Sequence, residues 1–117
     1  DYPKNEKKHI WGNLENYFPV STNEIPEKDI IDRLLFTQII EAISCYEKNI
    51  ITSIQDANIG SILGLGFPSD SGGILQFVNN YGVQKFRDRS LQLAEHYGKR
   101  FTPPKLLNEM ARTKKDF

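Results

Sequence analysis

The sequence predicts an all-α protein, a compact bundle of about five helices. Apolar residues recur at helical spacing along most of the 117 residues, and glycine or proline stands near each expected helix end. No stretch of useful length alternates apolar and polar residues as a half-buried strand does. The chain is also long enough to bury a core of its own as a single domain.

Residues 1–24 are expected to form a linker that carries one short packing helix. Residues 1–8 are polar and charged, which favours mobility. The apolar and aromatic side chains that follow recur at helical spacing, and Pro19 ends this pattern. We expect them to pack on the main body, residues 25–117; they are Ile10, Trp11, Leu14, Tyr17 and Phe18.

The first long helix is expected from about Pro26 to Lys48, a length of roughly 33 Å. Its apolar stripe is expected to be buried and consists of Ile31, Leu34, Leu35, Ile39, Ala42, Ile43 and Tyr46. Three further apolar residues widen the stripe, so more than one side of the helix should be covered; they are Ile30, Phe36 and Ile40. Short helices alone are not expected to cover all of these side chains. The candidates for an interface are Ile31, Leu34, Leu35 and Ile39.

Four shorter helices complete the predicted bundle. They are expected at Ser53–Leu63, Gly73–Tyr81, Val83–Tyr97 and from Thr102, which precedes Pro103 and Pro104. Ser53 and Asp56 have the spacing of a capping box at the start of the second helix. Gly82 and Gly98 are expected to end the third and fourth helices, and residues 114–117 should fray.

The glycine-rich stretch from Gly64 to Gly73 is expected to organise these helices as a stiff turn. Glycine reaches positive φ without a steric cost, and Pro68 biases Phe67 toward an extended conformation. The Phe67 ring should therefore fill an apolar space between helices. The predicted structural motif consists of Gly64, Gly66, Phe67, Pro68, Gly72 and Gly73.

This stretch does not match a nucleotide-binding motif. The dinucleotide fingerprint Gly-x-Gly-x-x-Gly needs a third glycine where Ser69 stands, and it needs a preceding strand where a helix is expected. A phosphate-binding P-loop needs a lysine near its end, and none is present here. Backbone N–H groups at the start of the next helix are the remaining way in which this region could hold an anion.

The composition argues against several classes of function. Fifteen basic and fifteen acidic side chains give no net charge, which argues against a broad nucleic-acid surface. No apolar run approaches the ~18 residues of a membrane span, and no signal peptide is visible. A cytoplasmic protein is expected. The start at Asp1, without a methionine, suggests a fragment or a processed chain.

The sequence indicates no catalytic, cofactor-binding or metal-binding residue. His9 and His96 stand far apart, and neither has a Cys or His cluster nearby. No two carboxylates present themselves as an acid–base pair, and no Gly-x-Ser-x-Gly elbow occurs. Cys45 falls on an apolar helical face and is expected to be a buried thiol.

Several short motifs stand in order along the chain. They are Asp32-Arg33-Leu34-Leu35-Phe36, Glu41-Ala42, Asp56–Gly60, Gly64–Pro68 with Gly72-Gly73, Tyr97–Pro104 and Leu106-Leu107, preceded by Trp11-Gly12-Asn13-Leu14. As a set they resemble the C-terminal helical domain of 3-hydroxyacyl-CoA dehydrogenases, which implies a fold like the C-terminal domain of 6-phosphogluconate dehydrogenase. The resemblance is closest to the terminal copy of that domain in multifunctional fatty-acid oxidation enzymes, such as the alpha subunit of the fatty-acid oxidation complex. It covers about Ile10 to Met110.

Three positions depart from the family pattern. Ile40 stands where the family often has asparagine, Ser69-Asp70 replaces Pro-Phe, and Asn79 stands where an aspartate is usual. These departures concern loop contacts rather than the fold.

The resemblance implies an indirect role in catalysis. In this family a Rossmann domain binds NAD and supplies a His–Glu pair, and the first helical copy lines the acyl-CoA cleft; none of these parts is in this chain. The implied role is a non-catalytic domain of an NAD-dependent 3-hydroxyacyl-CoA dehydrogenase of β-oxidation, which supports the substrate domain. Its partners would be the Rossmann and first helical domains. Alone, the chain is expected to be inactive, without a cofactor, and a homodimer. The alternative is a stand-alone helical interaction module with no enzymatic parent.

Overall fold

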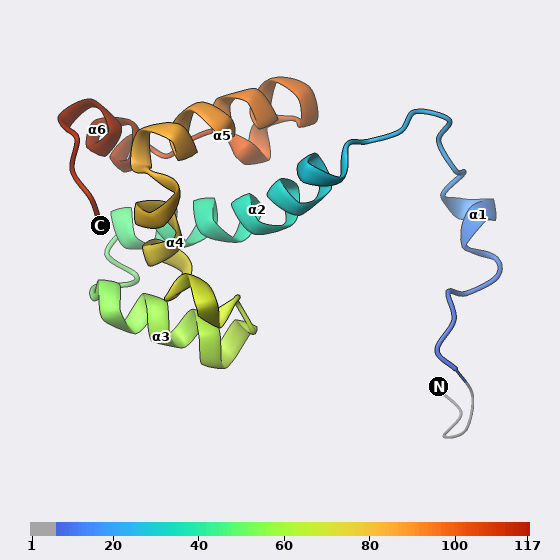
Figure 1. Ribbon diagram of the computed structural model, residues 1–117, viewed down its shortest axis with the longest axis horizontal. Coiled ribbons are helices and arrows are strands. Elements are labelled where there is room, and N and C mark those ends of the chain that lie inside the picture. The colour runs from blue at the N-terminus through green and yellow to red at the C-terminus, as the bar shows by residue number, and fades with distance from the viewer. Residues whose placement is uncertain (1–6) are drawn as a thin grey trace.

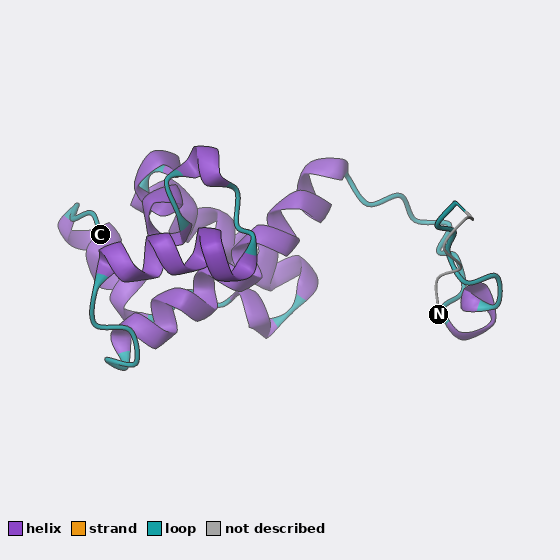
Figure 2. Ribbon diagram, turned by 90° about the horizontal axis from the view of Figure 1, so that it is seen from below, coloured by secondary structure: helices purple, strands orange, loops and turns teal. Residues whose placement is uncertain are grey.

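Helix α2 (Glu27–Glu47) runs through the centre of the fold, and helices α4, α5 and α6 pack against it (Figure 1). The computed structural model describes residues 7–117, so most of the charged segment 1–8 lies outside the described residues. Every regular element within 7–117 is helical, which confirms the all-α prediction (Figure 2). Five of these helices have eight or more residues, in agreement with the predicted number.

The helices begin and end close to the predicted positions, with two exceptions. The remaining elements are α1 (Leu14–Tyr17), α3 (Ile54–Leu65), α4 (Ile74–Tyr81), α5 (Val83–Tyr97) and α6 (Lys105–Thr113), with 3₁₀ turns η1 (Ser69–Ser71) and η2 (Lys99–Phe101). Ser53 caps α3 as predicted, because its Oγ accepts a hydrogen bond from the Asp56 N–H at 3.2 Å. Helix α3 continues past Gly64. Helix α6 is capped at Pro104 and not at Thr102 as expected, a shift of two residues, because Thr102 is held extended before Pro103.

The core is one apolar cluster to which α2, α4, α5 and α6 all contribute. Its fully buried side chains include Phe36, Ile39, Ile43, Leu75, Val78, Phe86, Leu93 and Leu107. The rings of Phe36 and Phe86 stack with centroids 4.1 Å apart and join α2 to α5. Tyr81 meets both rings edge-on at the end of α4. The aromatic contacts therefore fix the three helices against one another.

The buried face of α2 differs from the predicted stripe. The residues that α2 buries are Asp32, Phe36, Ile39, Ile40 and Ile43, whereas Ile30, Ile31 and Leu34 are exposed. Leu34 lies on the opposite side of the helix from Phe36, with 65% of its surface exposed. The reason is that Asp32 pairs with Arg89 of α5 and turns this side of α2 inward. Among the interface candidates, Ile39 therefore lies in the core, Leu35 is half-buried, and Ile31 and Leu34 remain on the surface.

The segment before α2 does not pack on the bundle as the sequence predicted. Residues 10–24, the N-terminal arm, run away from the bundle in both views and include the one-turn helix α1, which buries no residue (Figures 1 and 2). Trp11 stacks on Tyr17 with ring centroids 5.5 Å apart, but both rings remain exposed. The arm is attached through Ile25, which Pro26 biases toward an extended conformation, so the chain leaves α2 pointing outward.

The C-terminal residues are anchored rather than frayed. The Asn79 amide donates to the Phe117 carbonyl and accepts from the Phe117 N–H, both at 3.0 Å. The Phe117 ring also meets Tyr46 of α2 edge-on. An aspartate at position 79, as is usual in the family that this chain resembles, would accept one of these bonds but could not donate the other while ionised.

We predict that Phe67→Ala destabilises the fold by about 3–5 kcal/mol, because the ring is only 3% exposed and meets Phe77 edge-on. Urea unfolding gives this free energy. The control is Leu65→Ala two residues earlier, which removes an apolar side chain that is 69% exposed and should change stability by less than about 0.5 kcal/mol. Equal unfolding midpoints for the two variants would contradict the assignment of Phe67 as a core side chain.

Candidate functional site

The turn between α3 and α4 adopts the left-handed conformations that favour glycine. Gly66 ends α3 with φ 67° and ψ 29°, and Gly72 follows η1 with φ 79°. Gly73 has φ 113° and ψ 174°, a region that other residues essentially never occupy. Gly64 has no such requirement, because it lies inside α3 with open space beside it. Of the predicted motif, Gly66, Gly72 and Gly73 therefore carry the backbone constraint.

Gly73 also lets the start of α4 approach α3 closely. A Cβ atom at Gly73 would lie 2.4 Å from the Cβ of Asn58 and 2.5 Å from its Cα. Because the two helices lie this close together, the Asn58 Oδ1 accepts hydrogen bonds from the N–H groups of Leu75, at 2.8 Å, and Gln76, at 3.0 Å. The Ser61 Oγ accepts from the Ile74 N–H at 3.1 Å. Side chains of α3 thus cap α4 across the turn.

This capping removes the anion site considered from the sequence. A phosphate or carboxylate at the start of α4 would need the free N–H groups of its first turn. Those of Ile74, Leu75 and Gln76 already donate to Asn58 and Ser61. The turn therefore has a structural role in joining two helices.

An ionic cluster joins α2 to α5 on the other side of the molecule. The Arg89 guanidinium donates to Asp32 at 2.7 Å and to Asp29 at 2.5 Å. The Tyr97 hydroxyl donates to the second oxygen of Asp29 at 2.6 Å. Lys28 completes the cluster with a bond of 2.8 Å to Asp32. Each carboxylate is thus already engaged by a cation, which suits a clamp between helices rather than a general acid or base.

The pKa shifts follow from these contacts. The hydrogen bond from Tyr97, followed by that from Arg89, lowers the pKa of Asp29 below its ordinary 3.8. The same bond to Asp29 raises the pKa of Tyr97 above 10.0. The hydrogen bond to Asp32 raises the pKa of Lys28. Both shifts move the pKa further from neutrality, so Asp29 is ionised and Tyr97 is protonated near neutral pH.

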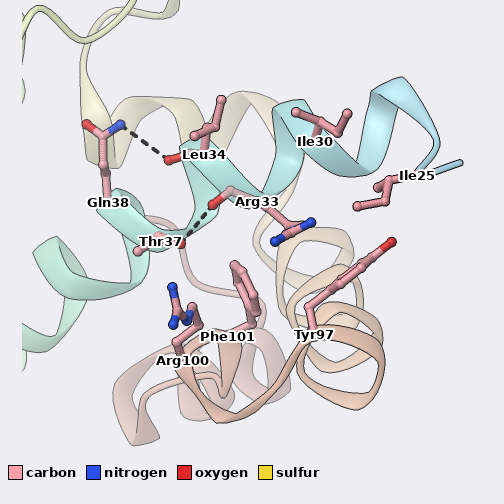
Figure 3. A pocket seen from close by; sticks show the side chains of 9 residues that line it. All are labelled: Ile25, Ile30, Arg33, Leu34, Thr37, Gln38, Tyr97, Arg100 and Phe101. Carbon is pink, nitrogen blue, oxygen red and sulfur yellow. Dashed lines mark hydrogen bonds between the residues drawn. The ribbon is translucent and has the colours of Figure 1, made fainter. Parts of the chain in front are cut away.

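A surface groove of about 630 Å³ lies beside this cluster, between the exposed side of α2 and the end of α5. Figure 3 shows its lining residues, which are Ile25, Ile30, Arg33, Leu34, Thr37, Gln38, Tyr97, Arg100 and Phe101. The Arg33 guanidinium lies 4.5 Å from the centre of the Tyr97 ring, and Arg100 approaches from η2 opposite Thr37 (Figure 3). Within residues 7–117, no carboxylate forms an ion pair with Arg33 or Arg100. The groove thus combines apolar walls with two positive charges that no acidic group neutralises by direct contact.

A second apolar surface lies on the outer side of α3. Ile59, Leu63 and Leu65 are exposed, Leu63 by 81%. Gly60 and Gly64, one turn apart on the same side, have no atom within 4 Å of the place of a Cβ. Exposed apolar side chains gathered on the uncovered side of a helix are typical of a contact surface.

The remaining residues considered for chemistry in the sequence form no metal site. No group of three or more His, Cys, Asp and Glu within the described range could hold a metal ion, and no helix there is long and apolar enough to cross a membrane. His96 lies in the last turn of α5, where its Nδ1 contacts the Gln92 carbonyl. Cys45 is half-buried beside Glu41 rather than fully buried.

The sequence did not identify the residues that connect α3 to α4 and α2 to α5. Asn58 and Ser61 were expected only as part of a helix, although their spacing places them beside the buried Ala57. No contact with another helix was expected for Asp29. Its i, i+3 spacing to Asp32 is the signal that both carboxylates face the same neighbour.

The chain is similar to bacterial proteins of fatty-acid oxidation. The fatty acid oxidation complex subunit alpha of Vibrio vulnificus is 35% identical over 81 residues, which cover 69% of this chain and 12% of that protein. The subunit from Acinetobacter baylyi is 35% identical over 102 residues, or 85% of this chain and 14% of that protein. The subunit from Idiomarina loihiensis is 33% identical over 111 residues, or 93% of this chain and 16% of that protein. No family model matches the chain.

These relatives confirm the resemblance to multifunctional fatty-acid oxidation enzymes. The chain spans only 12–16% of the length of these three relatives, so the comparison concerns a small part of a much longer protein.

We predict that Gly73→Ala destabilises the fold more than Gly66→Ala does. Both positions have positive φ, which costs alanine about 1–2 kcal/mol in the left-handed helical region of Gly66. Only at Gly73 would the new methyl group also overlap Asn58, so the total there should reach roughly 3 kcal/mol or more. Thermal and urea unfolding of the two variants measure the difference. Equal losses would mean that the approach to Asn58 does not limit this position.

We also predict that the contribution of Asp29 to stability depends on pH. Its pKa is lower in the folded chain than the ordinary 3.8, so its stabilising effect is present above pH 3.8 and is lost as the pH falls through the folded-state pKa. Asp29→Asn should therefore destabilise the protein at pH 7, and the difference from the wild type should shrink in acid. Glu27→Gln in the same helical turn is the control, because Glu27 forms no ion pair among the described residues. A difference that stays constant from pH 7 to pH 2 would contradict this account.

Proposed function

Because the chain is homologous to a short part of fatty acid oxidation complex alpha subunits, we propose that it is a non-catalytic domain of a β-oxidation enzyme. The enzyme would be an NAD-dependent 3-hydroxyacyl-CoA dehydrogenase, and this chain its C-terminal helical domain. In this role it supports the substrate domain through packing contacts. NAD would bind elsewhere in the longer protein, and the enzyme would act in the cytoplasm.

The observation that carries this proposal is the pair of exposed apolar surfaces on a well-packed bundle. One is the outer side of α2, with Ile30, Ile31 and Leu34, and the other is the outer side of α3, with Leu63. Each surface belongs to a helix whose opposite side is already in the core or packed on α4. Such apolar patches on a soluble domain mark contact surfaces. They suit a domain packed between neighbours, here the Rossmann and first helical domains of the longer chain.

The ionisable groups support a structural role as well. Asp29 and Asp32 are both paired with Arg89, and Tyr97 donates to Asp29. Among the described residues, each of these groups is already engaged in an ion pair or a hydrogen bond, which suits a structural contact better than proton transfer. We therefore propose that the chain holds no catalytic residue and no cofactor of its own. Without its neighbouring domains, it is expected to form a homodimer through the exposed side of α2.

The same surfaces also fit a stand-alone helical interaction module, which is the alternative. The two functions differ in whether this chain can replace the matching segment of an enzyme. The test therefore uses the Vibrio vulnificus subunit in its natural form, with the segment aligned to this chain deleted, and with that segment replaced by this chain.

We predict that the replacement restores 3-hydroxyacyl-CoA oxidation, followed as NADH absorbance, to at least tenfold above the deleted form. Leu63→Glu in the replaced segment should reduce this activity, because it places a charge on the apolar side of α3. Gln55→Glu, an exposed polar change on the same helix, is the matched control. The free chain should show neither oxidation nor NAD binding by calorimetry. A folded chimera no more active than the deleted form would favour the interaction module, and saturable NAD binding by the free chain would overturn the non-catalytic role.

A further inference from the structure

The groove between α2 and η2 contains two arginines that have no carboxylate partner. Arg33 and Arg100 line the groove, and neither forms an ion pair with any of the described residues. The nearby carboxylates of Asp29 and Asp32 do not neutralise them, because Arg89 already pairs with both. A guanidinium group binds a carboxylate through short, charge-assisted hydrogen bonds. The groove therefore offers two strong donors to a negatively charged partner.

The Arg33 guanidinium is already held in position at the groove. It lies 4.5 Å from the centre of the Tyr97 ring. The Tyr97 hydroxyl donates to Asp29 and so fixes the ring. A guanidinium that stacks on a ring keeps the N–H groups at its edge free to donate to a carboxylate. Arg33 therefore loses little conformational freedom when it pairs, which favours binding.

The rest of the groove is largely apolar and offers few other donors. Its wall includes Ile30 and Leu34, which are both exposed. The Thr37 hydroxyl and the Gln38 side-chain amide already donate to carbonyls of α2. An extended peptide would need partners for its backbone groups, whereas a helix satisfies its own and presents only side chains. The groove therefore suits one side of a helix.

The two arginines lie at different places in the groove. Figure 3 shows the Arg33 side chain turned toward Tyr97, whereas Arg100 comes from η2 and lies opposite Thr37. A small anion such as phosphate would need both guanidinium groups at a single point. Carboxylates on the two borders of an apolar strip match this arrangement better, and an amphipathic helix has such a strip.

We infer that the groove binds an amphipathic helix from a neighbouring domain of the longer enzyme. The apolar side of this helix packs on Ile30 and Leu34, and its carboxylates pair with Arg33 and Arg100. This inference rests on the proposed contact role of α2 and adds the chemistry of the partner. Apolar burial supplies most of the affinity, whereas the arginines select the partner and its orientation.

Charge reversal tests this inference in the Vibrio vulnificus subunit that carries this chain. Arg33→Glu/Arg100→Glu should lower 3-hydroxyacyl-CoA oxidation about tenfold or more relative to the unchanged chimera, because it places like charges against the partner helix. Arg33→Gln/Arg100→Gln, which only removes the charges, should lower it less. The control, Arg112→Glu on the exposed side of α6, should leave the activity unchanged. Circular dichroism of the free chain checks that each variant is folded.

Zero-length cross-linking locates the partner carboxylates directly. Arg33→Lys and Arg100→Lys each supply an amine that a carbodiimide joins to an adjacent carboxylate, and mass spectrometry of the peptides identifies the acidic residue. New cross-links should lead to Asp or Glu residues outside the segment that this chain replaces. Arg112→Lys gives the background. The cross-links are read whether or not the chimera is active, so they test the inference separately from the proposed function.

Three results would overturn the inference. A charge-reversed chimera as active as the unchanged one would do so and leave the proposed function in place. Cross-links only to Glu15 or Glu24 would place the N-terminal arm of this chain in the groove. No new cross-link from either lysine would mean that the groove meets no carboxylate in the longer enzyme.

Discussion

The close approach of Gly73 to Asn58 is the constraint on which the arrangement of α3 and α4 depends. A side chain at position 73 would overlap the Asn58 backbone, so only glycine lets the first turn of α4 reach the two acceptors on α3. Because those acceptors occupy its N–H groups, α4 needs no cap of its own. Its direction is then set, and with it the positions of Leu75 and Val78 in the core.

The second determinant is the ionic cluster between α2 and α5, which decides which side of α2 faces inward. Helix α2 is apolar on two sides, so its hydrophobic pattern alone does not select one of them. Asp32 is buried and reaches Arg89, which places Phe36 and Ile40 toward the core and leaves Leu34 outside. A buried charge therefore specifies orientation here, although paired charges contribute little to net stability in general.

The sequence predicted the elements of this fold better than the contacts between them. Helix ends follow from local rules, and the cap at Ser53 and the stops at Gly82 and Gly98 are present as expected. The inward side of α2 was predicted only in part: Ile39 and Ile43 are buried as expected, whereas Ile31 and Leu34 are exposed. The pairing of Asp32 with Arg89, 57 residues later, was not foreseen. The packing of the aromatic arm was also predicted wrongly, since helical spacing shows that side chains share a face and not what covers that face.

The candidate surfaces also depend on contacts between distant elements, which the sequence did not predict. Ile31 and Leu34 could be chosen from composition, but Arg33 and Arg100 meet at one groove only because η2 turns the chain back toward α2. Asn79 was recognised only as a departure from a pattern, and its pairing with the backbone of Phe117 gives that departure a physical reason. Residues that act between distant elements are the ones that local patterns do not identify.

The hydrogen bonds between α3 and α4 and the ionic cluster between α2 and α5 connect residues at very different separations along the chain. This difference bears on the order in which the protein folds. The bonds from α4 to Asn58 span 17 and 18 residues, whereas those from Arg89 and Tyr97 to α2 span 57 to 68. Closing a longer loop costs more chain entropy before any contact forms. On this ground we expect the α3–α4 pair to form first and α2 and α5 to close over the core later. The folding rate would then depend on the turn between α3 and α4. The unfolding rate would depend on the ionic cluster between α2 and α5.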